Sequence, residues 1–327
     1  MTAGVTAAGL LGAATVSGAH ASEAPQPRPT KSRYVIGLVA KSNENPVFLA
    51  ARTGAQDAAR KIGRDLGVEI VIDWQTPTSE DAQRQATAVE RLASVADGIA
   101  ISASDANLLV SSINSAVERG VPVVAFDSDV PTSKRFAYFG TNDFECGKQV
   151  AGELVKVMGD AGVVAVLAGN QNAPNLQARV KGVLEGLKAH PGVKLKEVYY
   201  HAETAQDAVL KVEQVMAANP DITGWAMVGG WPLFTKNAMK SVAGKAKVVA
   251  VDALPAQLDY VRSGEVQTLL GQQVYEWGYQ SVTLLMDKIV AGKEPAGGAI
   301  VNAPLTVVGT ANVEEYSKNW ERWLRRR

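Results

Sequence analysis

Residues 121–142, VPVVAFDSDVPTSKRFAYFGTN, decide which fold we expect for the whole chain. The apolar run at 121–126 predicts a strand that is buried on both faces, as in a parallel sheet. Asp127 and Ser128 follow its carboxyl end, and residues 136–140 predict a second strand that leads into a helix. Ligands of open α/β sheets bind beyond the carboxyl ends of the strands. We therefore expect a binding cleft here, between two lobes that the chain crosses at this point.

Alternating strand and helix patterns continue on both sides of this stretch. Residues 34–126 contain four apolar strand patterns separated by three helical patterns. Residues 162–308 repeat the alternation, with a helix expected over 232–242 and one last extended stretch over 300–308. Strands separated by helices are typical of parallel, doubly wound sheets. The predicted fold class is therefore α/β, with two lobes whose parallel sheets are flanked by helices.

The composition is that of an ordinary globular protein. The chain has 327 residues, and single hydrophobic cores stop growing near about 250–300 residues, so we expect two domains. Its 33 Lys and Arg balance 33 Asp and Glu, and 46% of its residues are apolar. A nucleic-acid-binding surface would require a basic excess. Nucleic acid is therefore not an expected partner.

Cysteine and histidine are too few to indicate disulfide or metal chemistry. Cys146 is the single cysteine, and its place in FECGKQVAGELV predicts a small buried residue on a helix, not a nucleophile. The three histidines, His20, His190 and His201, have no partners at the spacing of metal ligands. We expect no metal and no other cofactor.

The first 32 residues are predicted to be a signal peptide and a flexible linker. A short apolar run at 6–16 is followed by Ala19-His20-Ala21, which has the A-x-A pattern of a signal-peptidase site. Cleavage after Ala21 would release an exported protein. The n-region contains no Lys or Arg, so a disordered leader in a cytoplasmic protein is the alternative. The run is too short to span a bilayer, and three prolines follow it at 24–31.

Polar side chains recur at the predicted strand ends, whereas motifs of known enzymes are absent. The sequence contains no G-x-G-x-x-G after a strand, no G-x-x-x-x-G-K-[ST], no G-x-S-x-G and no H-E-x-x-H. A single strand-end Asp or Asn commonly caps the next helix. Recurrence favours a ligand instead, because carboxylates, amides and an aromatic ring suit a neutral ligand rich in hydroxyls. These strand-end residues are Asn45, Ser102, Asp127, Asn142, Gly230, Trp231, Asp252 and Gln272.

Several segments resemble the periplasmic sugar-binding proteins of the ribose-binding type, the substrate-binding components of ABC importers. Among them are VIGLVAKSNENPVFLAARTGAQDAARKIG, YFGTNDFECGKQVAGEL and VVAVDALPAQLDYVRSGEVQTLLGQQ. The resemblance implies two Rossmann-like lobes joined by a hinge of three crossings, near 140–142, 272–273 and 301–303. It divides the chain into an N-terminal lobe, a C-terminal lobe and a helical tail. The corresponding residues are 33–140 with 273–302, 141–272 with 303–312, and 313–327.

The same resemblance implies a function and a set of ligand-binding residues. A monosaccharide or related polyol would be captured in the periplasm by hinge closure and delivered to a membrane permease by a monomeric protein. Asp127 would bind two sugar hydroxyls, Phe48 would stack on the ring, and Arg179 would reach the ligand from the second lobe. The implied ligand-binding residues are Lys41, Asn45, Phe48, Ser102, Asp127, Ser128, Asn142, Arg179, Trp231, Asp252 and Gln272.

Some positions depart from the family pattern. Val47 stands where ribose binders have a second aromatic residue, and Ser128 stands where they have an arginine. Glu203-Thr204-Ala205 replaces a stretch that usually supplies another aromatic residue, and Gly229-Gly230-Trp231 replaces an Asn-Asp pair. Ribose itself is therefore not the expected ligand. Trp231 either stacks on the ligand or belongs to the core.

Other functional classes use the same fold. A sugar-sensing partner of a chemoreceptor or of a two-component system would have the same lobes. A sugar-responsive repressor would need a helix-turn-helix before them, and residues 1–32 are too short and too poor in basic residues for one. A carbohydrate enzyme would need catalytic motifs that the sequence lacks. We therefore expect a binding protein and not an enzyme.

Overall fold

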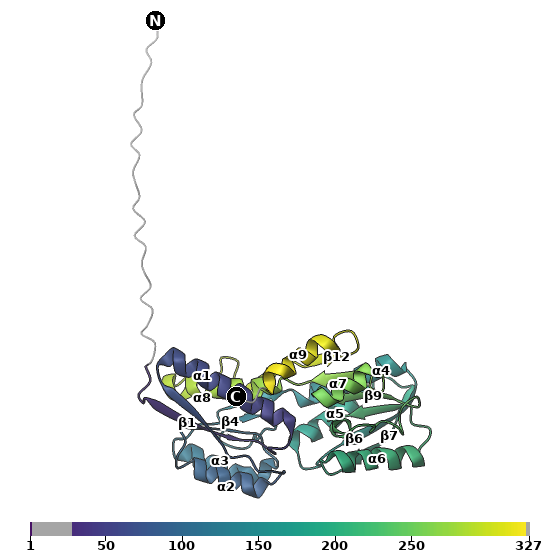
Figure 1. Ribbon diagram of the computed structural model, residues 1–327, viewed down its shortest axis with the longest axis horizontal. Coiled ribbons are helices and arrows are strands. Elements are labelled where there is room, and N and C mark those ends of the chain that lie inside the picture. The colour runs from purple at the N-terminus through teal and green to yellow at the C-terminus, as the bar shows by residue number, and fades with distance from the viewer. Residues whose placement is uncertain (2–27, 325–327) are drawn as a thin grey trace.

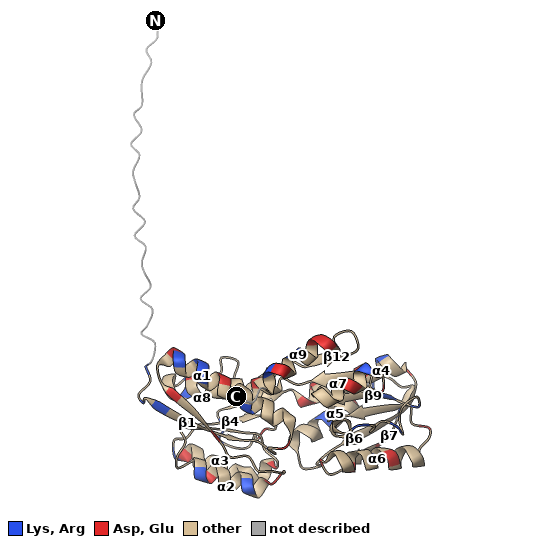
Figure 2. Cartoon of the chain, viewed as in Figure 1, with Lys and Arg blue, Asp and Glu red and all other residues tan. Residues whose placement is uncertain are grey.

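Two lobes of alternating strands and helices lie side by side (Figure 1). This computed structural model describes Met1 and residues 28–324. The predicted signal peptide and its cleavage site after Ala21 lie outside the described residues. Among the described helices, none is both long and apolar enough to cross a membrane. Lys and Arg alternate with Asp and Glu over both lobes (Figure 2), so neither lobe presents one sign of charge in this view.

The N-terminal lobe is a six-stranded sheet with helices on both faces. All its strands are parallel, in the order β11-β5-β4-β3-β1-β2. Helices α1 and α8 pack together over one face, and α2 and α3 over the other (Figure 1). The elements are β1 (Arg33–Val39), α1 (Pro46–Leu66), β2 (Glu69–Trp74), α2 (Ala82–Leu92), β3 (Gly98–Ile101), α3 (Ala106–Glu118), β4 (Val123–Phe126), β5 (Ala137–Thr141), α8 (Val274–Ala291) and β11 (Ile300–Ala303).

The C-terminal lobe repeats this plan. Its strand order is β12-β10-β9-β8-β6-β7, with β12 antiparallel to β10 and the other pairs parallel. The elements are α4 (Asp143–Met158), β6 (Gly162–Ala168), α5 (Pro174–Leu187), β7 (Val193–Tyr200), α6 (Ala205–Ala218), β8 (Gly224–Met227), the 3₁₀ helix η1 (Trp231–Phe234), β9 (Lys247–Val251), α7 (Pro255–Arg262), β10 (Thr268–Gly271) and β12 (Thr306–Val308). A last helix, α9 (Val313–Trp323), lies across the junction of the two lobes (Figure 1).

Two expectations about elements were wrong. The helix expected over 232–242 is only the short η1 followed by turns, and Asn237 there has a left-handed φ of 62°, which an α-helix cannot contain. The extended stretch expected over 300–308 is two strands in different sheets, because β11 pairs with β5 and β12 pairs with β10. Pro304 lies between them and has no N–H for a ladder.

The chain passes between the sheets three times, after β5, after β10 and after β11. Thr141 and Ala303 still pair with each other in the N-terminal sheet. The first and third crossings therefore begin one residue after the lobe boundaries expected from the sequence, 140 and 302. With that shift, we propose the division into 33–141 with 273–303, 142–272 with 304–312, and a helical tail.

Close helix pairs hold each lobe together. On α4, a Cβ added at Gly147 would lie 2.0 Å from the carbonyl oxygen of Arg179 on α5. On α5, a Cβ added at Gly182 would lie 2.0 Å from the carbonyl oxygen of Phe144. Only glycine allows the two helices to approach this closely. Cys146, on the same helix, is buried as expected, and burial raises its pKa to about 12.

Helix α9 joins the apolar cores of the two lobes. Its buried residues Tyr316, Trp320 and Trp323 belong to one hydrophobic cluster with residues of both lobes. The Trp320 indole N–H donates to the carbonyl oxygen of Ala253 in the C-terminal lobe, at 2.7 Å. The ring of Trp323 stacks on Tyr275 of α8 in the N-terminal lobe, with 6.3 Å between the centroids. The cluster therefore continues from one lobe into the other through this helix.

Candidate ligand-binding cleft

Two aspartates occupy equivalent places in the two lobes. Asp127 follows β4 and Asp252 follows β9, and each of these strands is third from the same end of its sheet. Both residues have left-handed backbones, with φ of 57° and 76°. This conformation is rare for residues other than glycine and often occurs at functional sites. Both side chains line one cavity between the lobes.

The cavity has an inner and an outer part. The inner part, which Asp127 and Asp252 line, has a volume of about 40 Å³. The outer part has a volume of about 960 Å³. Asn45, Glu80, Glu203 and Trp231 line both parts, so they form one continuous cleft. Small-molecule sites have volumes of about 300–1,000 Å³, so a ligand needs more room than the inner part offers in this arrangement.

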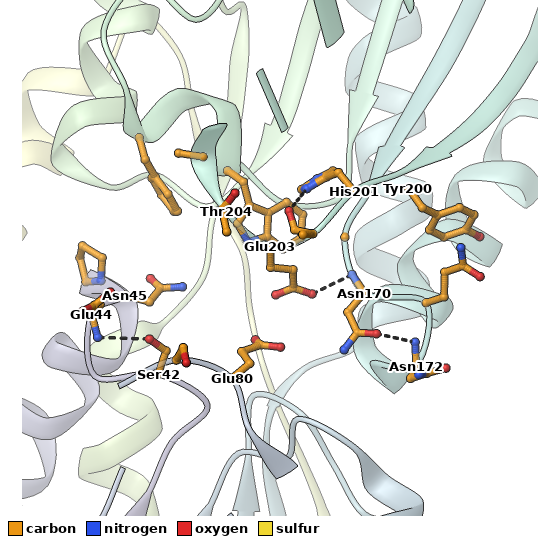
Figure 3. A pocket seen from close by; sticks show the side chains of 18 residues that line it. Ser42, Glu44, Asn45, Glu80, Asn170, Asn172, Tyr200, His201, Glu203 and Thr204 are labelled. Carbon is orange, nitrogen blue, oxygen red and sulfur yellow. Dashed lines mark hydrogen bonds between the residues drawn. The ribbon is translucent and has the colours of Figure 1, made fainter. Parts of the chain in front are cut away.

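Side chains from both lobes face each other across the cleft. Figure 3 shows Asn45 and Glu80 approaching from the N-terminal lobe and Glu203 from the opposite side. Asn45 caps α1, since its Oδ1 accepts a hydrogen bond from the Val47 N–H at 3.2 Å. Glu203 accepts a hydrogen bond through Oε1 from the backbone N–H of Asn170, at 2.9 Å. Polar side chains of both lobes therefore face the cleft.

Asp127 lies in a small buried network in the N-terminal lobe. Its Oδ2 accepts a hydrogen bond from the Ser102 hydroxyl at 2.7 Å, and the Lys41 Nζ lies 4.0 Å from the same oxygen. Lys41 is only 4% exposed. Burial lowers the pKa of Lys41, but the charges of Asp127 and Glu80 outweigh burial, and the pKa is raised overall. The ammonium group therefore stays charged beside the cavity.

Arg179 is the corresponding cation of the C-terminal lobe. It is 3% exposed, and all three of its guanidinium nitrogens donate to protein atoms. Nε donates to Asp143 Oδ1 at 2.8 Å, Nη1 to the Val228 carbonyl oxygen at 3.1 Å, and Nη2 to Gln272 Oε1 at 2.8 Å. Burial raises the pKa of Asp143 to about 6 although Arg179 opposes the shift. The guanidinium is thus held in one orientation at the cavity wall.

Gln272 connects the hinge to both charged groups. Its Oε1 also accepts from the hydroxyl of Thr141, at 2.8 Å, where the first crossing begins. Its Nε2 donates to Asp252 Oδ1 at 2.8 Å. Burial raises the pKa of Asp252, and the Arg179 charge and this hydrogen bond oppose the shift. One buried amide therefore links two crossings, Arg179 and Asp252.

Comparison with known proteins identifies the family. Residues 36–294 match the profile of the family described as "Periplasmic binding protein domain". The chain belongs to this family. The resemblance noted in the sequence and the predicted two-lobed α/β fold of this periplasmic binding protein are thereby confirmed.

Curated relatives and solved structures give the same result. A D-apiose import binding protein of Actinobacillus succinogenes is 24% identical over 70% of this chain and 71% of its own length. The ribose import binding protein RbsB of Bacillus subtilis is 24% identical over 84% of this chain and 87% of its own length. An ABC transporter solute binding protein from Burkholderia graminis, solved in complex with D-arabinose, has a TM-score of 0.80 and 27% identity, with coverage of 88% and 99%. The relatives are named as binding proteins, which confirms the prediction of a binding protein and not an enzyme.

The structure of the periplasmic binding protein brings most of the predicted site residues together. Three do not line the inner cavity. Ser102 instead supports Asp127, and Ser128 is fully buried, its hydroxyl without a partner among the described residues. Asn142 is exposed and caps α4 by accepting from the Glu145 N–H at 3.2 Å. The residues that line the inner cavity as predicted are Lys41, Asn45, Phe48, Asp127, Arg179, Trp231, Asp252 and Gln272.

The two interpretations of Trp231 are not mutually exclusive. Trp231 is 8% exposed and belongs to the hydrophobic cluster of the C-terminal lobe. It also lines both parts of the cleft, and its ring lies edge-on to His201 with 5.0 Å between the centroids. On the other side of the inner cavity, Phe48 is 3% exposed and 6.2 Å from the ring of Trp277. Aromatic surfaces therefore border the cavity from both lobes.

Seven residues of the inner cavity wall are not among the predicted ligand-binding residues: Val47, Glu80, Asn175, Leu176, Glu203, Gly229 and Trp277. Val47, Glu203 and Gly229 were named only as departures from the family pattern. Glu80 lies in the loop before α2, Asn175 in the first turn of α5, and Trp277 in the first turn of α8. The indole N–H of Trp277 has no hydrogen-bond partner among the described residues. Asn175 and Trp277 could have been found from the sequence, because the first turn of a helix that follows a strand end or a crossing faces the same cleft. The loop that carries Glu80 has no comparable pattern.

Proposed function

We propose that this periplasmic binding protein captures a monosaccharide or a related polyol in the periplasm and delivers it to the permease of an ABC transporter. The observation that carries the proposal is the pair Asp127 and Asp252, at the ends of equivalent strands and lining one cavity between two lobes. Carboxylates accept hydrogen bonds from hydroxyl groups. The aromatic rings of Phe48 and Trp231 suit the apolar faces of a sugar ring.

The names of the relatives support a sugar as the ligand. They name D-apiose and ribose, and the structural neighbour is in complex with D-arabinose. Because these sugars differ, the names support the class of ligand and not one member of it. The departures at Val47 and Ser128 also argue against ribose in this chain.

Hinge closure is the step that would convert binding into delivery. A sugar that bonds to Asp127 in one lobe and to Asp252 in the other is bound more tightly when the lobes are closed. A ligand shifts such an equilibrium only by its difference in affinity for the two states. Gln272, which contacts the first crossing and Asp252, is placed to respond to this motion. The closed, liganded form would then dock as a monomer on the permease.

Two experiments test this function. A thermal-shift screen against pentoses, hexoses, deoxysugars and polyols should identify a ligand that stabilises the protein by about 2.7 kcal/mol at about a hundred times its Kd. Native mass spectrometry should then find one unchanged sugar per chain. A screen without any stabilising sugar or polyol, or a sugar that is chemically altered, contradicts the proposal.

Export can be tested separately. We infer that Ala21-Ser22 is the signal-peptidase junction, so the protein recovered from the periplasm should begin at Ser22. Intact-mass measurement of the periplasmic and cytoplasmic fractions checks this start. Material that retains the first 21 residues in the periplasm contradicts this route of export.

A further inference from the structure

The inner cavity has more negative than positive groups. Four carboxylates line it, those of Glu80, Asp127, Glu203 and Asp252, whereas the basic residues that line it, within the described part of the chain, are Lys41 and Arg179. The charge of Arg179 is also shared with a carboxylate outside the cavity, because its Nε bonds to Asp143 at 2.8 Å. Buried charges are normally compensated by partners of opposite sign. A neutral ligand would leave this excess of negative charge to be relieved by protonation of the carboxylates.

The excess is concentrated where the two lobes meet. Glu80 and Glu203 come from opposite lobes, and Figure 3 shows their carboxyl groups directed toward one another. Burial raises the pKa of Glu80 to about 7; Lys41 opposes the shift, whereas the charges of Glu203 and Asp127 and a hydrogen bond with Glu203 add to it. Without ligand, a proton on this pair therefore relieves the repulsion.

A second observation at the same place indicates a ligand with a positive charge. A Cβ added at Gly169 would lie 2.8 Å from Cγ of Glu203 and 2.9 Å from Cη2 of Trp231, so the acid and the ring are neighbours. Trp231 lines both parts of the cleft together with Glu80 and Glu203. The face of a tryptophan ring attracts ammonium groups, and more strongly where water is excluded. Carboxylates from two lobes beside an indole thus provide the surroundings that an ammonium group requires.

A third observation shows that the ligand also needs hydrogen-bond acceptors. Lys41 is more than nine-tenths buried and lines the inner cavity, yet its ammonium group makes no hydrogen bond within the described part of the chain. Its closest carboxylate oxygen, on Asp127, is 4.0 Å away. Buried polar groups without a partner are rare in native proteins. An oxygen of a bound sugar or polyol would complete the bonding of Lys41.

We propose that the ligand is a sugar or polyol that carries a protonated amine, with the ammonium group held between Glu80 and Glu203 beside Trp231. The hydroxyl groups of the same ligand then bond to Lys41, Asp127 and Asp252 in the inner cavity. This inference rests on the proposed function and names the chemical class of its ligand.

The proposal predicts the direction in which protons move. An ammonium group between the two glutamates favours the ionised form of both, so Glu80 gives up its proton when the ligand binds. Binding near pH 7 should release protons to the buffer. For an amine that stays protonated up to pH 8, such as 1-amino-1-deoxy-D-sorbitol, binding should tighten as the pH rises from about 6 to about 8. A neutral ligand lacks the charge that drives this release.

Matched pairs of compounds test the proposal. We would measure binding to D-glucosamine and D-glucose, to D-galactosamine and D-galactose, and to 1-amino-1-deoxy-D-sorbitol and D-sorbitol, by calorimetry at pH 6, 7 and 8. Buffers with different ionisation enthalpies report the number of protons released. At least one amine should bind at least tenfold more tightly than its neutral partner and should release protons at pH 7.

Variants locate the ammonium group. Glu80→Gln and Glu203→Gln should each reduce the preference for the amine at least tenfold, because a glutamine keeps the shape and removes the charge. Glu90→Gln is the matched control, since Glu90 is an exposed acid on α2 and its removal changes the net charge equally. That variant should keep the preference of the wild type.

The outcomes separate this inference from the proposed function. Neutral sugars that bind as tightly as the amines, or more tightly, overturn the inference and leave the proposed function standing. If neither the amines nor the broader panel of neutral sugars and polyols bind, the inference and the proposed function are both overturned. A strong preference for an amine that survives both Glu80→Gln and Glu203→Gln overturns the assignment of the ammonium group to this pair.

Discussion

Asp127 and Asp252 combine a strained backbone with an acidic side chain. A left-handed conformation costs an ordinary residue about 1–2 kcal/mol, and here it occurs after equivalent strands of both lobes. Glycine would adopt the same conformation without this cost. A carboxylate occupies both positions in spite of the strain, which supports a role in ligand binding.

Replacing Asp127 by glycine tests its role in ligand binding. Asp127→Gly removes an acceptor of hydroxyl hydrogen bonds, and a buried hydrogen bond to a charge contributes about 1.5–3 kcal/mol. Sugar affinity should therefore fall at least about tenfold. The unfolding free energy should also decrease, because the substitution leaves the buried Lys41 without its nearest carboxylate and the Ser102 hydroxyl without its acceptor, although glycine relieves the left-handed strain. Calorimetry and urea unfolding measure the two quantities.

Asp129 provides the control for this variant. It lies two residues further on, pairs with Arg135, and does not line the inner cavity. Asp129→Asn should therefore leave sugar affinity within about twofold of wild type. Wild-type affinity in Asp127→Gly would show that Asp127 only organises the backbone.

At this scale the sequence predicted positions better than conformations. Asp127, Asp252 and Gln272, which the sequence placed at strand ends, line the cavity wall. Asn142 was also at a strand end, but it became the cap of α4, and the next residue, Asp143, bonds to Arg179 instead. Which of two neighbouring residues points toward Arg179 depends on the angle at which the helix begins, and this angle follows from tertiary packing.

Helices α4 and α5 cross closely enough to fix the position of Arg179. Gly147 on α4 faces the carbonyl oxygen of Arg179, and Gly182 on α5 faces that of Phe144. The backbone that carries the guanidinium group is therefore in direct contact with α4. A change in this contact should affect both the stability of the lobe and the binding site.

Two glycines on the same helix allow a controlled test of this contact. Gly147→Ala would place a Cβ 2.0 Å from the Arg179 carbonyl oxygen, so it should destabilise the protein by about 1–3 kcal/mol and weaken sugar binding. Gly152→Ala meets no atom within 4 Å, so it should be neutral or stabilise the helix by up to about 1 kcal/mol. Urea unfolding measures the stability of the two variants. Equal effects of the two substitutions would show that the helices can move apart freely.

The order of the elements was predictable, and the exceptions have physical reasons. Hydrophobic periodicity predicted the alternation of strands and helices in both lobes. It failed over 232–242, where apolar residues at helical spacing pack as turns around the left-handed Asn237. It also missed the division of 300–308 between two sheets, because strand pairing is set by partners distant in the sequence.

The pKa values predict an unusual pH dependence for the whole unliganded molecule. Burial raises the pKa of Asp143 to about 6 and that of Glu80 to about 7, so the folded protein binds these protons more tightly than the unfolded chain. Stability should therefore be greater at low pH in this range and should decrease as the pH rises from about 4 to about 7. One pKa unit corresponds to about 1.4 kcal/mol, or a few degrees in melting temperature.

Comparison with Glu80→Gln isolates one of these groups. In the variant, stability should no longer decrease near pH 6–7. The decrease in stability at lower pH, which arises from Asp143, should remain. Thermal unfolding of both proteins between pH 4.5 and 8, without ligand, measures the difference. Parallel curves for the two proteins across the range would contradict the assignment to Glu80.

The apolar cluster that continues through α9 has a consequence for cooperativity. Two lobes connected only by extended crossings could melt one after the other, but here neither lobe can lose its core without exposing Trp320 or Trp323. We expect one calorimetric transition whose van't Hoff and calorimetric enthalpies agree.

Trp323→Ala removes the stacking on Tyr275, so it should split or broaden the transition. A single sharp transition in this variant would mean that the crossings alone couple the lobes. If the transition splits or broadens, α9 couples the two lobes into one cooperative unit. Unfolding of either lobe would then unfold the other and expose both to proteolysis.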